Sequence, residues 1–123
     1  MTILVAEDDM ITLKTIELRL TKDGHKVIIS QDGRDALKKI EDSSPDLIIT
    51  DIMMPFSSGF EIIGAAKKKE GKKIPIIVLS AMGQENVVLE AFELGADDYI
   101  TKPFSPNELS VRVKRYFPSA IKI

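Results

Sequence analysis

The stretch Ile3-Leu4-Val5-Ala6-Glu7-Asp8-Asp9 indicates the fold, because an apolar run ends in three acids and a helical pattern follows at once. A short continuous apolar run is typical of a strand that is buried on both faces. The helix is predicted over residues 10–22, with Asp9 at its N-cap. The segment therefore predicts one strand–helix unit of a parallel sheet whose strand ends in carboxylates.

The same unit recurs along the chain. Further apolar runs predict strands at residues 26–29, 47–50, 74–79 and 99–101. Further helices are predicted after Asp32-Gly33, after Ser57 or Ser58 as far as about Gly71, over residues 85–94, and from Ser105 with Pro106 at its first position. Alternating strands and helices imply parallel pairing through right-handed crossovers. We therefore predict an α/β three-layer sandwich with a doubly wound five-stranded parallel sheet and five helices.

The composition is that of one globular domain. The chain has 123 residues, 44% of them hydrophobic and 29% charged, which argues against a disordered or disulfide-scaffold protein. A formal charge of −2 disfavours direct nucleic-acid binding by this chain and attraction to a membrane surface. The absence of cysteine excludes zinc–thiolate sites and thiol catalysis and fits a reducing cytoplasm.

The ends of the chain carry two further expectations. The start lacks the pattern of a secretory signal, and no apolar run approaches the roughly 18 residues of a membrane helix, so we expect a soluble cytoplasmic protein. Only residues 118–123 follow the last predicted helix, so we expect these 123 residues to form a single domain and to encode no output domain, whether the domain stands alone or is the first part of a longer protein.

Polar side chains follow four of the predicted strands, at the edge where open parallel sheets bind ligands. They are Glu7, Asp8, Asp9, Asp51, Ser80 and Lys102. Clustered carboxylates repel one another unless a cation compensates, and Mg²⁺ prefers hard oxygen ligands of this kind. With Lys102 opposite, such an ion would clamp a phosphoryl group. Asp51, at the end of the central strand, is the candidate nucleophile because a carboxylate can form an acyl phosphate.

Two other features have a simpler interpretation. His25 is the only histidine and lies away from the acids, so we interpret it as structural. The lysine-rich run at residues 67–73 lies at a predicted helix end, where cations interact favourably with the helix dipole.

Four segments in order resemble the receiver domains of bacterial two-component response regulators. They are residues 3–9 (ILVAEDD), 45–55 (PDLIITDIMMP), 76–81 (IIVLSA) and 95–104 (GADDYITKPF). The resemblance extends from Ile3 to about Phe117. It implies a flavodoxin-like fold with strand order 2-1-3-4-5.

The resemblance also implies the roles of the site residues. Asp51 would accept a phosphoryl group from a phosphohistidine of a sensor histidine kinase or phosphotransfer protein. The ligands of Mg²⁺ would be Asp8 directly, Glu7 through water, Asp51, and the backbone carbonyl of Met53. Three consecutive acids leave a choice of register, and we prefer Glu7 and Asp8 because Asp9 opens the helix. The phosphoryl group would be bound by Ser80, Ala81 and Lys102, and the Lys102-Pro103 peptide would be cis.

A switch is implied as well. On phosphorylation Ser80 would move toward the new anion and Tyr99 would rotate into the vacated space. The face of the fourth helix, fifth strand and fifth helix would then change and act on a downstream effector or output domain. This face resembles the dimer face of transcription-factor receivers in its charged residues, which makes a phosphorylation-dependent homodimer a hypothesis. The residues concerned are Asp97, Asp98, Glu108, Arg112 and Arg115, with Val88 where those proteins carry a basic residue.

The predicted function is a phosphorylation-activated switch that catalyses only its own phosphorylation and dephosphorylation and is not a metabolic enzyme. A hydrolase of the haloacid dehalogenase type needs a second acid two residues after the nucleophile, where this chain has Met53. A nucleotide-binding domain needs a glycine-rich phosphate loop, which the sequence lacks. A pseudo-receiver that binds proteins without phosphorylation stays open, because only the intact acid set argues against it.

Overall fold

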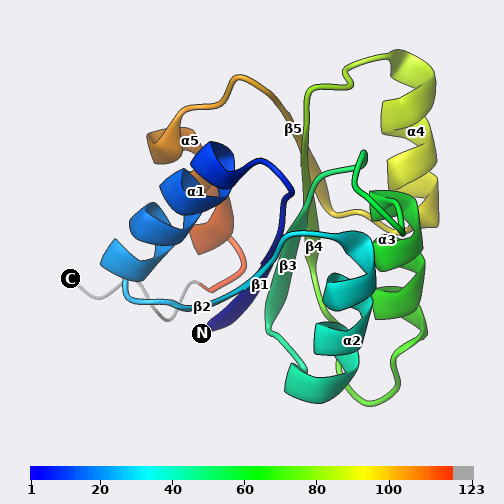
Figure 1. Ribbon diagram of the computed structural model, residues 1–123, viewed down its shortest axis with the longest axis horizontal. Coiled ribbons are helices and arrows are strands. Elements are labelled where there is room, and N and C mark those ends of the chain that lie inside the picture. The colour runs from blue at the N-terminus through cyan, green and yellow to red at the C-terminus, as the bar shows by residue number, and fades with distance from the viewer. Residues whose placement is uncertain (118–123) are drawn as a thin grey trace.

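The computed structural model describes residues 1–117 and shows them as a parallel β-sheet between two layers of helices (Figure 1). The strands are β1 Thr2–Ala6, β2 Lys26–Ser30, β3 Leu47–Thr50, β4 Ile76–Ser80 and β5 Asp98–Thr101. The helices are α1 Met10–Lys22, α2 Gly33–Ser43, α3 Gly59–Lys68, α4 Glu85–Leu94 and α5 Pro106–Lys114. The strand order is β2-β1-β3-β4-β5 and every neighbouring pair is parallel. The predicted doubly wound fold is confirmed.

The two helix layers cover opposite faces of the sheet. Figure 1 shows α1 and α5 on one side and α2, α3 and α4 on the other. Alternate residues of β1 therefore enter different cores: Ile3 and Val5 pack in the cluster that contains α1 and α5, and Leu4 and Ala6 pack in the other. All four side chains are buried. This double burial fixes β1 firmly and with it the acids that follow.

Two predicted boundaries are wrong by two residues or more, and several strand ends differ by one residue. β4 begins at Ile76 and not at residue 74, because Pro75 has no N–H to donate to a neighbouring strand. Its carbonyl still accepts the Ile48 N–H at 3.0 Å. α3 ends at Lys68, short of Gly71, and its N-cap is Ser58, whose N–H donates to the Glu61 carboxylate at 3.2 Å.

The lysine-rich run lies at the ends of two helices. Lys67 and Lys68 are in the last turn of α3, as predicted. Lys69 Nζ donates to the Glu41 carbonyl at 3.4 Å and Lys72 Nζ to the Ser44 carbonyl at 2.9 Å. Both carbonyls lie at the C-terminal end of α2. Lys69 and Lys72 therefore also satisfy carbonyls at the end of α2, where unpaired carbonyls concentrate negative partial charge. Within residues 1–117 no helix is both long and apolar enough to cross a membrane.

His25 is buried between α1 and β2. Its ring centroid is 5.6 Å from that of Phe117, and among residues 1–117 its Nδ1 has no hydrogen-bond partner. Burial lowers the pKa of His25, the N-terminal ammonium and Lys114 lower it further, and Asp23 opposes them. The structural interpretation of this histidine fits its position in the core.

We expect His25 to make the protein less stable as the pH falls from about 7 to about 5. A histidine has an unfolded pKa of about 6.5, so with a lower folded pKa the unfolded chain binds the proton first and gains stability. Urea unfolding at both pH values should show a smaller loss for His25→Leu than for the wild type. Equal losses in the two proteins would show that His25 does not carry this dependence.

Candidate functional site

The register of the sheet brings the acids together. Ala6 at the end of β1 is the partner of Thr50 at the end of β3, so Glu7 and Asp51 leave the sheet side by side. Glu7 is 2% exposed and Asp51 is 8% exposed. With the exposed Asp8, these residues each offer a carboxylate oxygen within 4.8 Å of the others. The structure therefore brings Glu7, Asp8 and Asp51 together as predicted.

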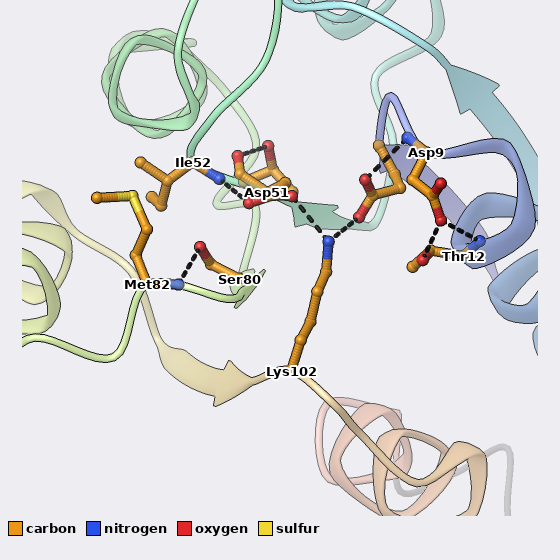
Figure 2. Close-up of polar contacts among 9 residues, drawn as sticks. Asp9, Thr12, Asp51, Ile52, Ser80, Met82 and Lys102 are labelled. Carbon is orange, nitrogen blue, oxygen red and sulfur yellow. Dashed lines mark hydrogen bonds and ion pairs between the residues drawn. The ribbon is translucent and has the colours of Figure 1, made fainter.

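Lys102 joins the two buried carboxylates. It follows β5, and its Nζ lies 2.6 Å from Glu7 Oε1 and 2.8 Å from Asp51 Oδ2. Figure 2 shows the Lys102 side chain reaching from the segment after β5 to Asp51. The Lys102-Pro103 peptide is cis, as the resemblance implied. An ammonium group thus lies where the carboxylates of two different strands meet.

The electrostatics of this cluster are unequal. Burial raises the pKa of Glu7, against the hydrogen bond from Lys102, which lowers it. Burial would lower the pKa of Lys102, but its hydrogen bonds to Asp51 and Glu7 raise it overall. One ammonium among three carboxylates leaves an excess of negative charge that a further cation can balance.

Asp9 belongs to the helix and not to the cluster. Its Oδ2 accepts the Thr12 N–H at 2.9 Å and the Thr12 hydroxyl at 2.6 Å, which makes Asp9 the N-cap of α1 as predicted (Figure 2). These hydrogen bonds lower the pKa of Asp9. Its own N–H donates to Glu7 Oε2 at 3.1 Å. The cap residue therefore also orients the neighbouring carboxylate.

The donor set fits a hard divalent cation. Both oxygens of Glu7 already accept hydrogen bonds, one from Lys102 and one from the Asp9 N–H. Asp51 Oδ1 accepts the Ile52 N–H at 2.6 Å. Asp8 is exposed and its carboxylate accepts no hydrogen bond from residues 1–117, so it is the freest oxygen donor of the three. Carboxylates beside an open face suit Mg²⁺, which keeps several of its waters.

Ser80 and Tyr99 meet at the backbone of Met82. Ser80 is buried at the end of β4, and its Oγ accepts the Met82 N–H at 3.1 Å. The Tyr99 hydroxyl donates to the Met82 carbonyl. Ala81 lies exposed between Ser80 and Met82. The sequence alone does not indicate this link, because the groups that join the two side chains are the backbone N–H and carbonyl of Met82.

The loop from Asp51 to Gly59 requires a glycine at its end. A Cβ atom on Gly59 would lie 2.1 Å from the Asp51 carbonyl oxygen, so no side chain fits there. This role of Gly59 was not predicted, because it depends on how closely the loop approaches the Asp51 backbone. Met53, whose carbonyl the resemblance makes a metal ligand, lies in this loop with its side chain exposed.

The charged residues compared with a dimer face are partly engaged within the chain. They lie on α5, at its C-cap, and in or beside β5, with Val88 half-buried on α4. Arg112 donates to both carboxylate oxygens of Asp98, at 2.8 and 2.9 Å, and pairs with Glu108 at 3.1 Å. Asp97 accepts the Ile76 N–H at 2.8 Å and pairs with Lys67 at 3.3 Å. Arg115 is exposed and has no ion pair among the described residues. The homodimer stays a prediction.

The fold and the site together define a doubly wound α/β domain with an acid cluster and a lysine at the carboxyl edge of its sheet. The family model for the response regulator receiver domain matches residues 3–114, and the chain belongs to this family. Receiver domains are signalling modules of two-component systems and not classical enzymes, and they interact with histidine kinases and effector domains.

Individual relatives agree with this assignment. The chain is 43% identical over 114 residues to response regulator RR06 of Streptococcus pneumoniae. The aligned region covers 93% of this chain and 52% of the relative. The chain spans about half the length of the curated relatives it matches.

Solved structures share the fold over nearly their whole length. The BeF3-activated receiver domain of DrrB superposes with a TM-score of 0.88 at 34% identity, covering 95% of this chain and 97% of that one. The receiver domain of the sensor histidine kinase PA1611 from Pseudomonas aeruginosa has a magnesium ion coordinated in its active-site cleft. It superposes with a TM-score of 0.86 at 28% identity, with coverage of 95% and 97%.

Removing the lysine should destabilise the protein in a way that depends on pH. Lys102→Met leaves Glu7 and Asp51 without their cation, which should lower the free energy of unfolding by about 3 kcal/mol at neutral pH. The loss should be smaller at about pH 5, because the already raised pKa of Glu7 rises further and a proton replaces the ammonium. Urea unfolding at both pH values measures this, with the exposed Lys14→Met as control. A loss that is the same at both pH values would contradict the role given to Glu7.

Proposed function

We propose that this chain is a phosphorylation-activated switch in which Asp51 accepts a phosphoryl group from a phosphohistidine on a sensor histidine kinase or phosphotransfer protein. The observation that carries the proposal is the Asp51 carboxylate, held 2.8 Å from Lys102 Nζ and within 4.8 Å of the carboxylates of Glu7 and Asp8. A carboxylate nucleophile, an ammonium group and a cation site within one cluster are the parts that phosphoryl transfer needs.

The transfer forms one bond and breaks one bond. An Asp51 oxygen attacks phosphorus while the phosphorus–nitrogen bond breaks, and the imidazole keeps the electron pair of that bond. Lys102, which now bridges Asp51 and Glu7, pairs with a phosphoryl oxygen instead. Water later hydrolyses the acyl phosphate and restores the carboxylate. The domain thus catalyses its own phosphorylation and dephosphorylation and turns over no metabolite.

The residues that would hold Mg²⁺ are Asp8 directly, Glu7 through water, Asp51, and the Met53 carbonyl. Support for this division comes from the hydrogen bonds, because both Glu7 oxygens are engaged within the chain and Asp8 is free to bind. When bound, the ion supplies positive charge against the oxygens of the transferring group. The magnesium ion in the active-site cleft of the PA1611 receiver domain supports the proposal of a magnesium site here.

The switch would run through Met82. When the Ser80 hydroxyl turns toward a phosphoryl oxygen, the Met82 N–H loses its present acceptor and the loop after β4 moves with it. The Met82 carbonyl in the same loop accepts the hydrogen bond from the Tyr99 hydroxyl, so a shift at Ser80 changes the surroundings of the tyrosine. Phosphorylation would then shift the population between two arrangements of the face formed by α4, β5 and α5.

That face would act on a downstream effector or on an output domain. Leu89 and Phe92 of α4 are exposed beside it and offer apolar surface for a partner. We assign the described residues to a single receiver domain. Residues 118–123, the last part of the domain predicted over 1–123, lie outside the described residues.

Acetyl phosphate with Mg²⁺ should label the wild type on Asp51. Intact-mass analysis should show the gain of one phosphoryl group that hydroxylamine removes, and Asp51→Asn should show none, since an amide cannot form the acyl phosphate. Asp9→Asn is a matched control, because asparagine caps a helix as well as aspartate does and the change leaves the cluster intact. It should be labelled like the wild type.

Two other results would change the conclusion. Labelling that persists in Asp51→Asn would show that another residue is the acceptor. No labelling of the wild type, by acetyl phosphate or by a phosphohistidine donor, would favour a pseudo-receiver that binds proteins without phosphorylation.

Ser80→Ala should separate phosphorylation from switching. In a Tyr116→Phe background Tyr99 is the only tyrosine, so its fluorescence reports on its own surroundings. Phosphorylation should change this fluorescence when Ser80 is present and should change it much less in Ser80→Ala, while mass analysis still finds the label. A full fluorescence change in the labelled Ser80→Ala protein would contradict the link through Met82.

A further inference from the structure

The loop after Asp51 contains a strained turn. The Ser57 N–H donates to the Pro55 carbonyl at 2.9 Å, which closes a three-residue γ-turn around Phe56. Phe56 has a φ of 73°, a conformation that is rare and strained for a residue with a side chain. Such a turn persists only when contacts outside it hold it in place.

These contacts come from the start of α2. The Gly33 N–H donates to the same Pro55 carbonyl at 3.0 Å. A Cβ atom on Gly33 would lie 1.9 Å from the Ser57 carbonyl oxygen, so the helix backbone rests directly against the turn. The next residue, Arg34, places its guanidinium carbon 4.1 Å from the centroid of the Phe56 ring. The turn is therefore held at its backbone by Gly33 and at its side chain by Arg34.

The turn matters for the site because of the loop in which it lies. The loop is closed at its base, where the Gly59 N–H donates to the Ile52 carbonyl at 2.8 Å. Asp51 directly precedes this closure, and Met53 lies between the closure and the turn. Met53 therefore lies between two hydrogen-bonded points of one short loop, the closure at Ile52 and the turn at residues 55–57.

We propose that Arg34 and Phe56 are positioning residues for the cation site. Their stacking holds the strained turn closed, and the closed turn keeps the Met53 carbonyl where it can bind Mg²⁺ together with Asp51. This inference rests on the metal site of the proposed function. It would give a role to Phe56, which is 68% exposed and occupies a position where glycine would be free of strain.

Magnesium affinity measured by calorimetry tests the proposal, with the full chain and Mg²⁺ alone as the ligand. Phe56→Ala keeps a strained Cβ but loses the ring, and Arg34→Ala loses the cation. Each should weaken Mg²⁺ binding roughly two- to fivefold, the range that a cation–π contact at an exposed site gives. The double variant should be no weaker than Phe56→Ala, because one contact is lost in both.

The Phe56→Gly variant distinguishes a role in holding the strained turn from a general effect of losing the aromatic ring. Phe56→Gly removes the ring and the strain together, so its Mg²⁺ affinity should return close to that of the wild type. Adding Arg34→Ala to Phe56→Gly should then change nothing further. If Phe56→Gly binds as weakly as Phe56→Ala, the role given to strain is wrong.

Charge cannot produce the expected result. Removing a cation near carboxylates would by itself strengthen Mg²⁺ binding, which is the opposite of the effect expected for Arg34→Ala. Lys38→Ala, an exposed lysine one turn further along α2, is the matched control and should bind Mg²⁺ as tightly as the wild type or slightly more tightly.

The outcomes distinguish this inference from the function on which it rests. Wild-type affinity in Arg34→Ala and Phe56→Ala, with normal binding by the wild type, would overturn the positioning role and leave the proposed function standing. No Mg²⁺ binding by the wild type at millimolar concentration would overturn the metal site and the positioning role together.

Discussion

The contact of the Lys102 ammonium with the carboxylates of Glu7 and Asp51 is the interaction on which the site depends. Two nearly buried acids from different strands are stable side by side only because a cation lies between them, at 2.6 and 2.8 Å. The single ammonium does not neutralise all three carboxylates, so the cluster keeps a net negative charge. A site that is incompletely neutralised is ready to bind a further cation and then an anionic group.

The sheet provides the rigidity that this arrangement needs. β1 is buried on both faces, and its register with β3 places Glu7 and Asp51 at the same level of the carboxyl edge. The connecting loops are then free to carry chemistry. The loop after Asp51 contains a strained turn, and the loop after Ser80 joins two side chains through one backbone residue, Met82. A strained turn and polar links of this kind persist only when the surrounding structure is rigid enough to hold them.

Much of the fold could be predicted from the sequence, because the signals involved are local. α1 and α4 begin and end at the predicted residues, since Asp9 caps the first and Gly95 ends the second. The start of β4 was wrong because Pro75 interrupts the hydrogen bonding of an otherwise apolar run. Lys67 and Lys68 lie in the last turn of α3 as predicted, but the contacts of Lys69 and Lys72 with carbonyls of α2 could not be predicted, because α2 is adjacent only in space.

The sequence alone determined the layers of the fold, the acids at the ends of the strands and the cap at Asp9, because strand burial and helix capping are read from neighbouring residues. It could not determine that Tyr99 meets Met82, that Arg34 lies on Phe56, or that Glu7 uses both of its oxygens within the chain. These contacts join residues far apart in the sequence, or involve backbone groups that every residue possesses. They depend on how the elements pack, and packing distances are not encoded in any local pattern.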